Sequence, residues 1–511
     1  MKTSEENNSR ESENSPEERI NLSRFRWVLG APYFVEGTMS LTEIPILYFI
    51  KFTLGMGGAG GQLFDSLRQI GWFIKPVWGY ISDKVPIFGY HRKSWYVLMA
   101  FLACVFWVIN ALLSFIGLKV AEVYLLTFNL AFATYAFVDV VCDALMVTYG
   151  RREGKVGAFV NFQWTILAIA NAGAVYLGGW FETRIQEGID HLWLVFLLTG
   201  GPPLLTAIVG ILFIDETRVE VEKEKKKRAS FQDFRGWVEK ALRRLRTAPA
   251  SFREFRRNNR PMWFMMLFIF FWKFSPSIGF IERSYLIDVR GFTPDAFGII
   301  LSAGGITFLV SVLVYSWVVK KIPSIGWHQY LYAMVALGVI TFPLSFYLYL
   351  NPNHPWWKFI YFRIPQWLNP LPSWNRYEWF RMVVQVTLGF ATIPAFMIPL
   401  TIAGETVNLA YAGMGYAFLM SLSNVTNLFE GVVGAGLYDL FSKPSMRGLL
   451  DTFQASFLNI AGTTDTRTLI LEMFVYISLF FTLLTIPFIE LLRRELDRRG
   501  IEVHLGGSKG A

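Results

Sequence analysis

The sequence is poor in charge and has almost no cysteine. Only 17% of its 511 residues are charged, whereas 53% are hydrophobic and 17% are aromatic; soluble domains are about one quarter charged. The two cysteines, Cys104 and Cys142, lie in apolar segments, where thiols pack as small hydrophobic groups, so we expect no disulfide. The five histidines are scattered, without an HExxH motif or Cys/His pairs, which argues against a zinc enzyme. No nucleophile–base pattern occurs either, so we expect neither an enzyme nor a bound cofactor.

The net charge of +9 comes mainly from cations in the connections between apolar runs. That placement favours a membrane protein over a nucleic-acid partner, because Lys and Arg accumulate on the cytoplasmic side of membranes. A helix that crosses the lipid needs about 20 apolar residues. Roughly twelve such runs begin near residues 33, 62, 94, 123, 158, 192, 262, 297, 329, 382, 412 and 470. Since only helices or closed barrels satisfy the backbone in lipid, we predict an all-α polytopic membrane protein.

The runs divide into two groups of six around a long basic connection. We predict an N-terminal bundle at residues 29–214, a linker at 215–260 and a C-terminal bundle at 261–495, with cytoplasmic tails at 1–28 (disordered) and 496–511. The linker segment FQDFRGWVEKALRRLR has apolar residues at helical spacing opposite basic ones. It predicts an amphipathic helix on the inner leaflet, in contact with anionic lipids; a solvated linker is the alternative.

The two groups of runs show weak internal similarity. LYFIKFTLG (residues 47–55) resembles SYLIDVRGF (residues 284–292), at corresponding places in the two halves. Duplicated halves indicate a transporter whose site lies at their interface. The connections that follow even-numbered runs are basic, and so is the C-terminal tail. This distribution predicts a multi-pass protein of the cell (inner) membrane with both termini in the cytoplasm.

Several acids lie within the apolar runs, where a charge costs about 2.5–3.5 kcal/mol on insertion scales. Glu36 is in the first run, and FVDVVCDALMV in the fourth places Asp139 and Asp143 one helical turn apart. Two ionised carboxylates at that spacing repel each other, and binding a proton relieves the repulsion. We therefore interpret Glu36, Asp139 and Asp143 as candidates for proton coupling; structural pairing with Arg or Lys is the alternative.

The candidate ligand contacts also include cations and amides. Arg68 either pairs with Asp65 one turn away or contacts an anionic ligand, and Lys273 is the deepest cation of the second half. Lys75 precedes a proline, and we expect it near the cytoplasmic interface. Asn424 is either a contact between helices or a contact to substrate. With Glu36 and Asp139, these residues give the predicted substrate set: Glu36, Arg68, Asp139, Lys273 and Asn424.

The connection GYISDKVPIFGYHRKSW (residues 79–95) resembles the loop between helices 2 and 3 of the major facilitator superfamily, G-x-x-x-D-[RK]-x-G-x-[RK]-[RK], with a longer insertion. Its VPIF insertion, DVVCDALMV and YFVEG are similar to the folate–biopterin transporter family, although Glu36 stands where that family has Gln. The resemblance runs from about residue 32 to the twelfth run. It implies twelve transmembrane helices in two pseudosymmetric six-helix bundles, and a gating role for the loop residues Gly79, Asp83, Lys84, Gly89, Arg92 and Lys93.

The resemblance also implies alternating access and proton-coupled uptake of a folate- or pteridine-like solute. Two other hypotheses stay open. One is a sugar or muropeptide permease coupled to protons or sodium, and the other is a membrane scaffold or receptor that transports nothing. The expected partners are therefore a small-molecule substrate, a coupling ion and the lipid bilayer.

Overall fold

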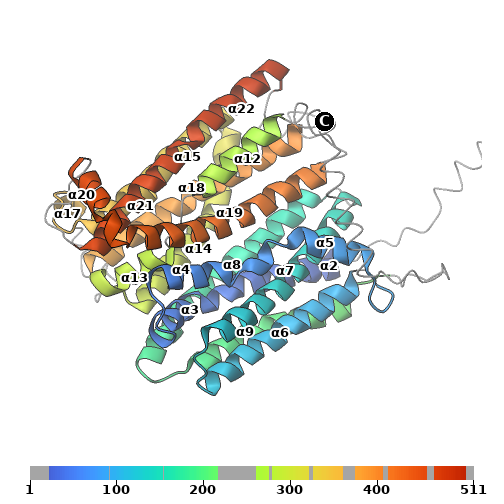
Figure 1. Ribbon diagram of the computed structural model, residues 1–511. Helices are drawn as coiled ribbons and strands as arrows, with labels where there is room; N and C mark the ends of the chain where they lie inside the picture. The colour runs from blue at the N-terminus through green and yellow to red at the C-terminus, as the bar shows by residue number, and fades with distance from the viewer. Residues whose placement is uncertain are drawn as a thin grey trace, which may run out of the picture.

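The computed structural model describes residues 22–90, 92–152, 155–216, 260–274, 279–321, 326–360, 374–406, 412–456 and 465–501. Nearly all of these residues are helical, and within these ranges the bridge between Ile87 and Tyr90 is the one β-type pairing. Figure 1 shows the helices of the first half below those of the second half, with long helices running side by side.

The first half contains six predicted runs, each of which coincides with one helix or a series of short ones. Its elements are α2 (Leu22–Thr38), η2 (Met39–Thr42), α3 (Glu43–Tyr48), η3 (Phe49–Thr53), α4 (Gly58–Leu67), η4 (Ile70–Trp72), α5 (Lys75–Lys84), α6 (Lys93–Phe115), α7 (Ala121–Arg152), α8 (Val156–Gln186) and α9 (Leu192–Phe213).

In the second half, too, each predicted run coincides with one helix or a series of short ones. Its elements are α12 (Arg260–Lys273), α13 (Gly279–Arg290), α14 (Pro294–Lys321), α15 (Trp327–Val339), η5 (Ile340–Leu344), α16 (Ser345–Leu350), α17 (Trp357–Ile360), α18 (Arg376–Thr406), α19 (Ala412–Phe441), η7 (Pro444–Met446), α20 (Arg447–Ser456), α21 (Thr466–Leu483) and α22 (Thr485–Arg499).

The first helix starts earlier than the sequence analysis placed it. Helix α2 begins at Leu22, inside the segment predicted as a disordered tail to residue 28. Phe25 and Val28 are buried, and the Phe25 ring lies 5.5 Å from the ring of Phe159 on α8. Burying these apolar side chains stabilises the additional helical turns. The linker between residues 217 and 259, with its predicted amphipathic helix, lies outside the described residues.

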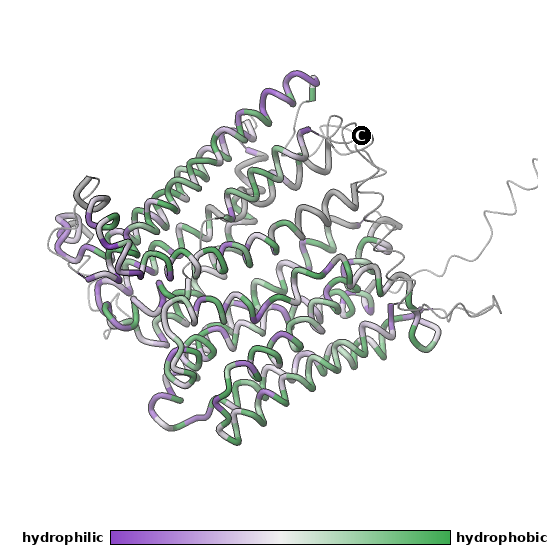
Figure 2. Tube along the Cα trace, viewed as in Figure 1, coloured by the Kyte–Doolittle hydropathy of each residue, from purple (hydrophilic) through white to green (hydrophobic). Residues whose placement is uncertain are grey.

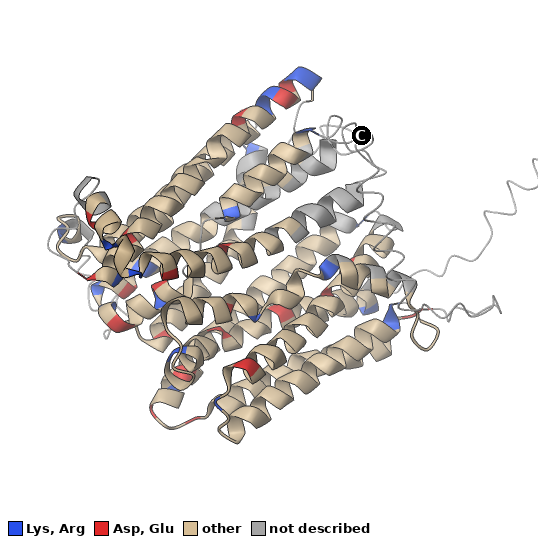
Figure 3. Cartoon of the chain, in the orientation of Figure 1, with Lys and Arg blue, Asp and Glu red and all other residues tan. Residues whose placement is uncertain are grey.

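Seven helical stretches among the described residues are long and apolar enough to cross a membrane. They are Lys93–Phe115, Ala121–Gly150, Ala158–Gln186, Leu192–Phe213, Pro294–Ser311, Trp327–Leu350 and Thr466–Arg499. Figure 2 shows hydrophobic residues along most of each helix, and Figure 3 shows acidic and basic residues inside the bundle as well as at its ends. These helices make the chain an all-α membrane protein; the total of twelve crossings stays a prediction.

The first two runs are broken rather than continuous. The first changes from α2 to the 3₁₀ turn η2, continues as α3 and ends in the π-helical turn η3. The second is interrupted by the 3₁₀ turn η4 between α4 and α5. Such interruptions often mark functional positions in membrane helices, because a freed backbone must face protein or a cavity rather than lipid. Both breaks lie next to the charges described below.

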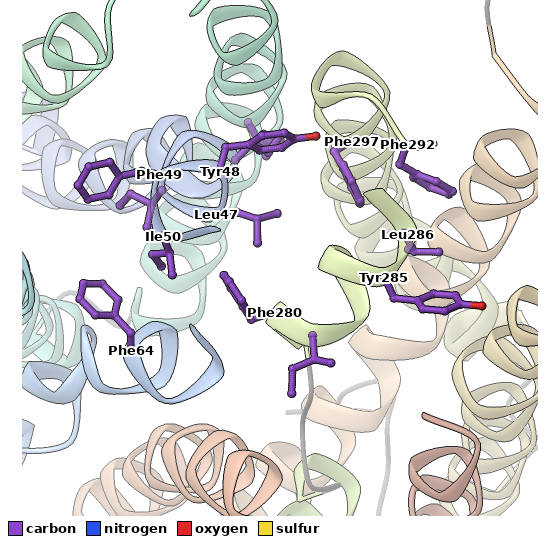
Figure 4. Close-up of a cluster of buried hydrophobic side chains, with 14 of the residues drawn as sticks. Leu47, Tyr48, Phe49, Ile50, Phe64, Phe280, Tyr285, Leu286, Phe292 and Phe297 are labelled. Carbon is purple, nitrogen blue, oxygen red and sulfur yellow. The ribbon is translucent and has the colours of Figure 1, made fainter. Parts of the chain in front are cut away.

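The two halves share one hydrophobic core at one end of the molecule, which we call the closed end. Figure 4 draws side chains from both halves in this cluster. The N-terminal half contributes Leu47, Tyr48, Phe49, Ile50 and Phe64, and the C-terminal half contributes Phe280, Tyr285, Leu286, Phe292 and Phe297. The connections at residues 54–57 and 291–293 lie at this end, so the apolar contact between the halves is formed where the odd-numbered connections lie.

Helices α8 and α14 cross between the halves with very little space. A Cβ atom added at Gly179 would lie 2.6 Å from the carbonyl oxygen of Pro294 and 2.8 Å from the Cα of Gly298. Both neighbours are backbone atoms, which cannot rotate away as a side chain can. The crossing therefore requires glycine at position 179.

Replacing this glycine should disrupt the contact between the halves. We expect Gly179→Val to lower stability by about 1–3 kcal/mol through overpacking, measured as the midpoint of thermal unfolding of the purified protein in detergent. Gly173→Val on the same helix is the control, because no atom lies within 4 Å of a Cβ added there. Equal effects of the two substitutions would show that the crossing does not depend on Gly179.

Candidate functional site

A cavity of about 590 Å³ lies between the two halves and contains most of the intramembrane charges. The first run lines it through α2, η2 and α3, the second through α4, η4 and α5, and the fourth and fifth through α7 and α8; α13 and α19 line it from the second half. Its charged lining consists of Glu36, Glu43, Asp65, Arg68, Lys75, Asp139, Asp143, Arg283 and Glu430, and its aromatic lining of Tyr33, Trp72, Phe73, Phe132 and Trp164.

Most of the predicted ligand and proton sites meet in this cavity. Glu36, Arg68, Asp139, Asp143 and Asn424 all line it, although they come from four runs that are far apart in the sequence. Lys273 is not part of the lining. It interacts electrostatically with Glu430, which does line the cavity. Lys273 therefore lies behind the lining. The functional roles of these residues stay predictions.

Lys75 and Asp139 form an ion pair inside the cavity. The Lys75 Nζ lies 2.6 Å from Oδ2 of Asp139, and these side chains are only 19% and 4% exposed. The same ammonium lies 4.5 Å from the centroid of the Trp72 ring. Lys75, the first residue of α5, thus pairs with an acid on α7. Its place near the cytoplasmic interface stays a prediction.

Glu36 and Asp143, the other two predicted proton sites, have no ion pair within the described part of the chain. Asp143 accepts a hydrogen bond of 3.0 Å from the hydroxyl of Tyr33 on α2. Glu36 has no hydrogen bond or ion pair within the described part of the chain, although it interacts electrostatically with Asp139, Asp143 and Lys75. One ammonium therefore stands among three carboxylates. That arrangement can bind a proton or a positively charged group.

Arg68 pairs within its own run. Its Nε lies 2.8 Å from Oδ1 of Asp65, and its side chain is 8% exposed. The guanidinium also lies 5.6 Å from the centroid of the Phe132 ring on α7. Of the two possibilities that the sequence left open, the structure has the internal pair. A hydrogen-bonded, buried guanidinium of this kind costs several kcal/mol to separate from its partner.

Two ion pairs connect the halves at the closed end. Arg283 on α13 places its NH2 2.7 Å from Oε1 of Glu43 on α3. Asp288, also on α13, receives Lys51 from the other half at 2.7 Å and Arg467 from its own half at 3.0 Å. The first pair lines the cavity, and the second lies beyond it.

Sequence reasoning missed the pairing of Lys51 with Asp288, although a signal for it was present. The two residues occupy the same place, the fifth, in the matched segments LYFIKFTLG and SYLIDVRGF. Segments related by pseudosymmetry meet at the axis between the halves. Opposite charges at equivalent positions are therefore well placed to pair there.

The loop between α5 and α6 is attached to neighbouring helices by its basic residues. Arg92 donates from NH1 to Thr148 Oγ1 at 2.8 Å, and Lys93 donates from Nζ to the carbonyl of Ile214 at 2.7 Å. Gly89 has a φ of +85°, a conformation that favours glycine. A Cβ added at Gly79 would make an ordinary contact of 3.5 Å with Val140, so packing does not require glycine there. The side chains of Asp83 and Lys84 lie outside the described residues, and the gating role stays a prediction.

Comparison with known proteins identifies the family. The sequence profile of the BT1 family matches residues 36–364, which is well over half of the chain. The chain belongs to the BT1 family. It is 26% identical over 469 residues to the folate-biopterin transporter of Synechocystis sp., covering 90% of this chain and 80% of that protein. It is also 26% identical over 331 residues to the probable folate-biopterin transporter 2 of Arabidopsis thaliana, covering 63% of this chain and 61% of that protein.

Solved structures show the same architecture. The D-xylose-proton symporter superposes with a TM-score of 0.61 and 11% identity, over 95% of this chain and 99% of that one. At such low identity the likeness concerns the fold alone, which is that of the major facilitator type. Family and fold together are those of a secondary membrane transporter. Among the described residues no group of three or more His, Cys, Asp and Glu could hold a metal ion.

The ion pair Lys75–Asp139 should stabilise the fold, because its ammonium group compensates the repulsion among the carboxylates of Glu36, Asp139 and Asp143. We expect Lys75→Gln to destabilise the protein by about 3–5 kcal/mol, the usual cost of removing one partner from a buried pair. Adding Asp139→Asn should restore part of that loss, because it removes one uncompensated carboxylate. The measurement is a double-mutant cycle on thermal unfolding in detergent.

A matched control is the exposed pair Lys443–Asp439, which has a separation of 3.7 Å and side chains that are 57% and 67% exposed. The same substitutions there should change stability by about 1 kcal/mol or less. Strictly additive effects of Lys75→Gln and Asp139→Asn would contradict the assigned role of the buried pair.

Proposed function

We propose that this chain takes up a folate- or pteridine-like solute together with protons, by alternating access. The observation that carries the proposal is the cavity between the duplicated halves. Its volume of about 590 Å³ falls in the range of about 300–1,000 Å³ that holds a small organic ligand. The names of the Synechocystis and Arabidopsis relatives, folate-biopterin transporter and probable folate-biopterin transporter 2, support the class of solute.

The aromatic side chains of the cavity suit a planar ring. Trp72 lies on η4, Tyr33 on α2 and Trp164 on α8, so flat surfaces approach the space from three runs. Tyr33 and Trp164 have their ring centroids 6.4 Å apart at an interplanar angle of 66°. Aromatic rings stack on, or meet the edges of, heterocycles with a gain of about 0.5–1.5 kcal/mol beyond area burial.

We assign the coupling proton to the pair Asp139 and Asp143. They lie one turn apart on α7, and Lys75 compensates only one of them. A proton on Asp143 would remove the excess negative charge without breaking the ion pair. Glu36, predicted for both proton coupling and ligand contact, lies on another helix and has no partner among the described residues. That lack of a partner favours ligand contact.

We place the closed end on the outer side of the cell (inner) membrane. The basic loop between α5 and α6 then lies in the cytoplasm, with both termini, as the distribution of cations favours. In this orientation the halves are joined on the outside by the apolar cluster and by the pairs Lys51–Asp288 and Glu43–Arg283. Opening to the outside requires these contacts to separate. The loop residues Asp83, Arg92 and Lys93 would act in the opposite gate, and the basic linker would bind anionic lipids.

Uptake into proteoliposomes tests solute and coupling together. With an inward proton gradient, labelled pterin should accumulate in wild-type vesicles. Asp143→Asn should reduce gradient-driven accumulation at least tenfold but keep exchange of internal for external pterin, because exchange needs no net proton movement. Glu187→Gln, the same chemical change in an exposed turn, is the control. Accumulation that follows a sodium gradient instead would refute proton coupling, and absence of uptake at any pH would refute the proposed solute.

Weakening the two ion pairs at the closed end should shift the protein toward the outward-open state. Spin labels on cysteines introduced at Thr53 and Val289, in a variant without Cys104 and Cys142, report the distance between the halves there. We expect Lys51→Gln combined with Glu43→Gln to add a longer distance to the distribution. Lys443→Gln, at an exposed pair within one half, should leave it unchanged. An unaltered distribution in the double variant would show that the pairs do not hold the halves together.

A further inference from the structure

The charges that line the cavity are strongly unbalanced. Of the described residues that line the cavity, six are acidic and three are basic, which gives these residues a formal excess of three negative charges. From the sequence, a contact between Arg68 and an anionic ligand is one of two alternatives.

All three cations of the lining are already paired with acids. Lys75 pairs with Asp139 at 2.6 Å, Arg68 with Asp65 at 2.8 Å and Arg283 with Glu43 at 2.7 Å. The Lys75 and Arg68 groups additionally lie over the rings of Trp72 and Phe132. An anionic ligand at one of these cations would have to share it with a protein carboxylate, so it would meet a positive charge that is already compensated.

The acids that remain differ in their surroundings. Glu430 interacts with Lys273, and Asp143 accepts the hydrogen bond of Tyr33. Glu36 and Glu430 are the lining acids for which the described residues provide no hydrogen bond or ion pair. Glu430 has Lys273 as a neighbouring cation of its own, whereas Glu36 shares Lys75 with Asp139 and Asp143. The Glu36 carboxylate is therefore the acceptor most available to a ligand.

We propose that this cavity selects an uncharged or positively charged planar heterocycle that presents adjacent N–H donors, and that it disfavours solutes bearing a carboxylate. Glu36 is the specificity-determining residue. The inference rests on the proposed function, and it narrows the folate- or pteridine-like class to rings without an acidic tail. A carboxylate accepts two parallel N–H bonds from an amidine-type edge, as it does from a guanidinium. The 2-amino-4-oxopteridine ring has such an edge.

Three probes with one ring and different charges test this selection. They are 6-(aminomethyl)pterin, 6-(hydroxymethyl)pterin and pterin-6-carboxylate, which are cationic, uncharged and anionic at neutral pH. Binding to the purified full-length protein is followed by tryptophan fluorescence or thermal stabilisation, so that transport is not required. We expect the cationic probe to bind most tightly and the anionic probe at least tenfold more weakly.

Two variants in the cavity should change this order in opposite ways. Glu36→Gln keeps the size of the side chain and removes its charge, and it should reduce the ratio between the cationic and anionic probes at least fivefold. Asp65→Asn frees Arg68 from its ion pair and should strengthen binding of pterin-6-carboxylate relative to wild type. Glu187→Gln, outside the cavity, should preserve the wild-type order.

The outcomes distinguish the proposed pteridine-like solute from the proposed selection by charge. Failure of all three probes to bind would refute the proposed pteridine-like solute, and the inference with it. Tight binding of the anionic probe, or equal binding of all three, would refute the charge selection and leave the proposed function intact. A selectivity that is the same in Glu36→Gln as in wild type would refute the role of Glu36.

Discussion

Compensation of charge inside the bundle is the constraint on which the rest of the structure depends. Lys75 is the cation shared by three acids, and its bond to Asp139 joins α5 to α7 at the wall of the cavity. A charge in this position is costly unless it is paired or faces a cavity. The same cost explains why Arg68 and Arg283 are paired as well. What remains uncompensated is negative, and this remainder gives the cavity its chemical character.

The breaks in the first two runs follow from the same constraint. Continuous helices would place Glu36 and Glu43, or Arg68 and Lys75, at fixed angles around one axis. The seven-residue spacing puts each of these pairs on nearly one face of its run, and the turns η2 and η4 lie between the paired residues; all four line one space. The first two runs are not among the single helices long enough to cross a membrane, because α2 has 17 residues and α4 and α5 have 10 each, whereas α6 and α9 are continuous and apolar. Charge and irregular backbone thus occur together where the cavity is.

The contact between the halves combines an apolar cluster with two ion pairs. The cluster around Leu47 and Phe280 supplies hydrophobic stabilisation, which is not directional, while Lys51–Asp288 and Glu43–Arg283 supply specific geometry. Ion pairs that are partly exposed contribute modest free energy. An interface built in this way can form reversibly, as alternating access requires, and the close crossing of Gly179 with Gly298 keeps the two halves in register.

The sequence by itself determined the class of the protein, the order of its helices and most of the charged residues of the site. Long apolar runs are local features, and the cost of charge in lipid makes Glu36, Asp139 and Asp143 conspicuous without any structure. Only the tertiary structure decided which charges pair. Lys75 lies 64 residues from Asp139, and Lys51 lies 237 residues from Asp288. Helical spacing carries no information at such separations. The net sign of the cavity depends on these pairings, and so it emerges only when the helices are packed together.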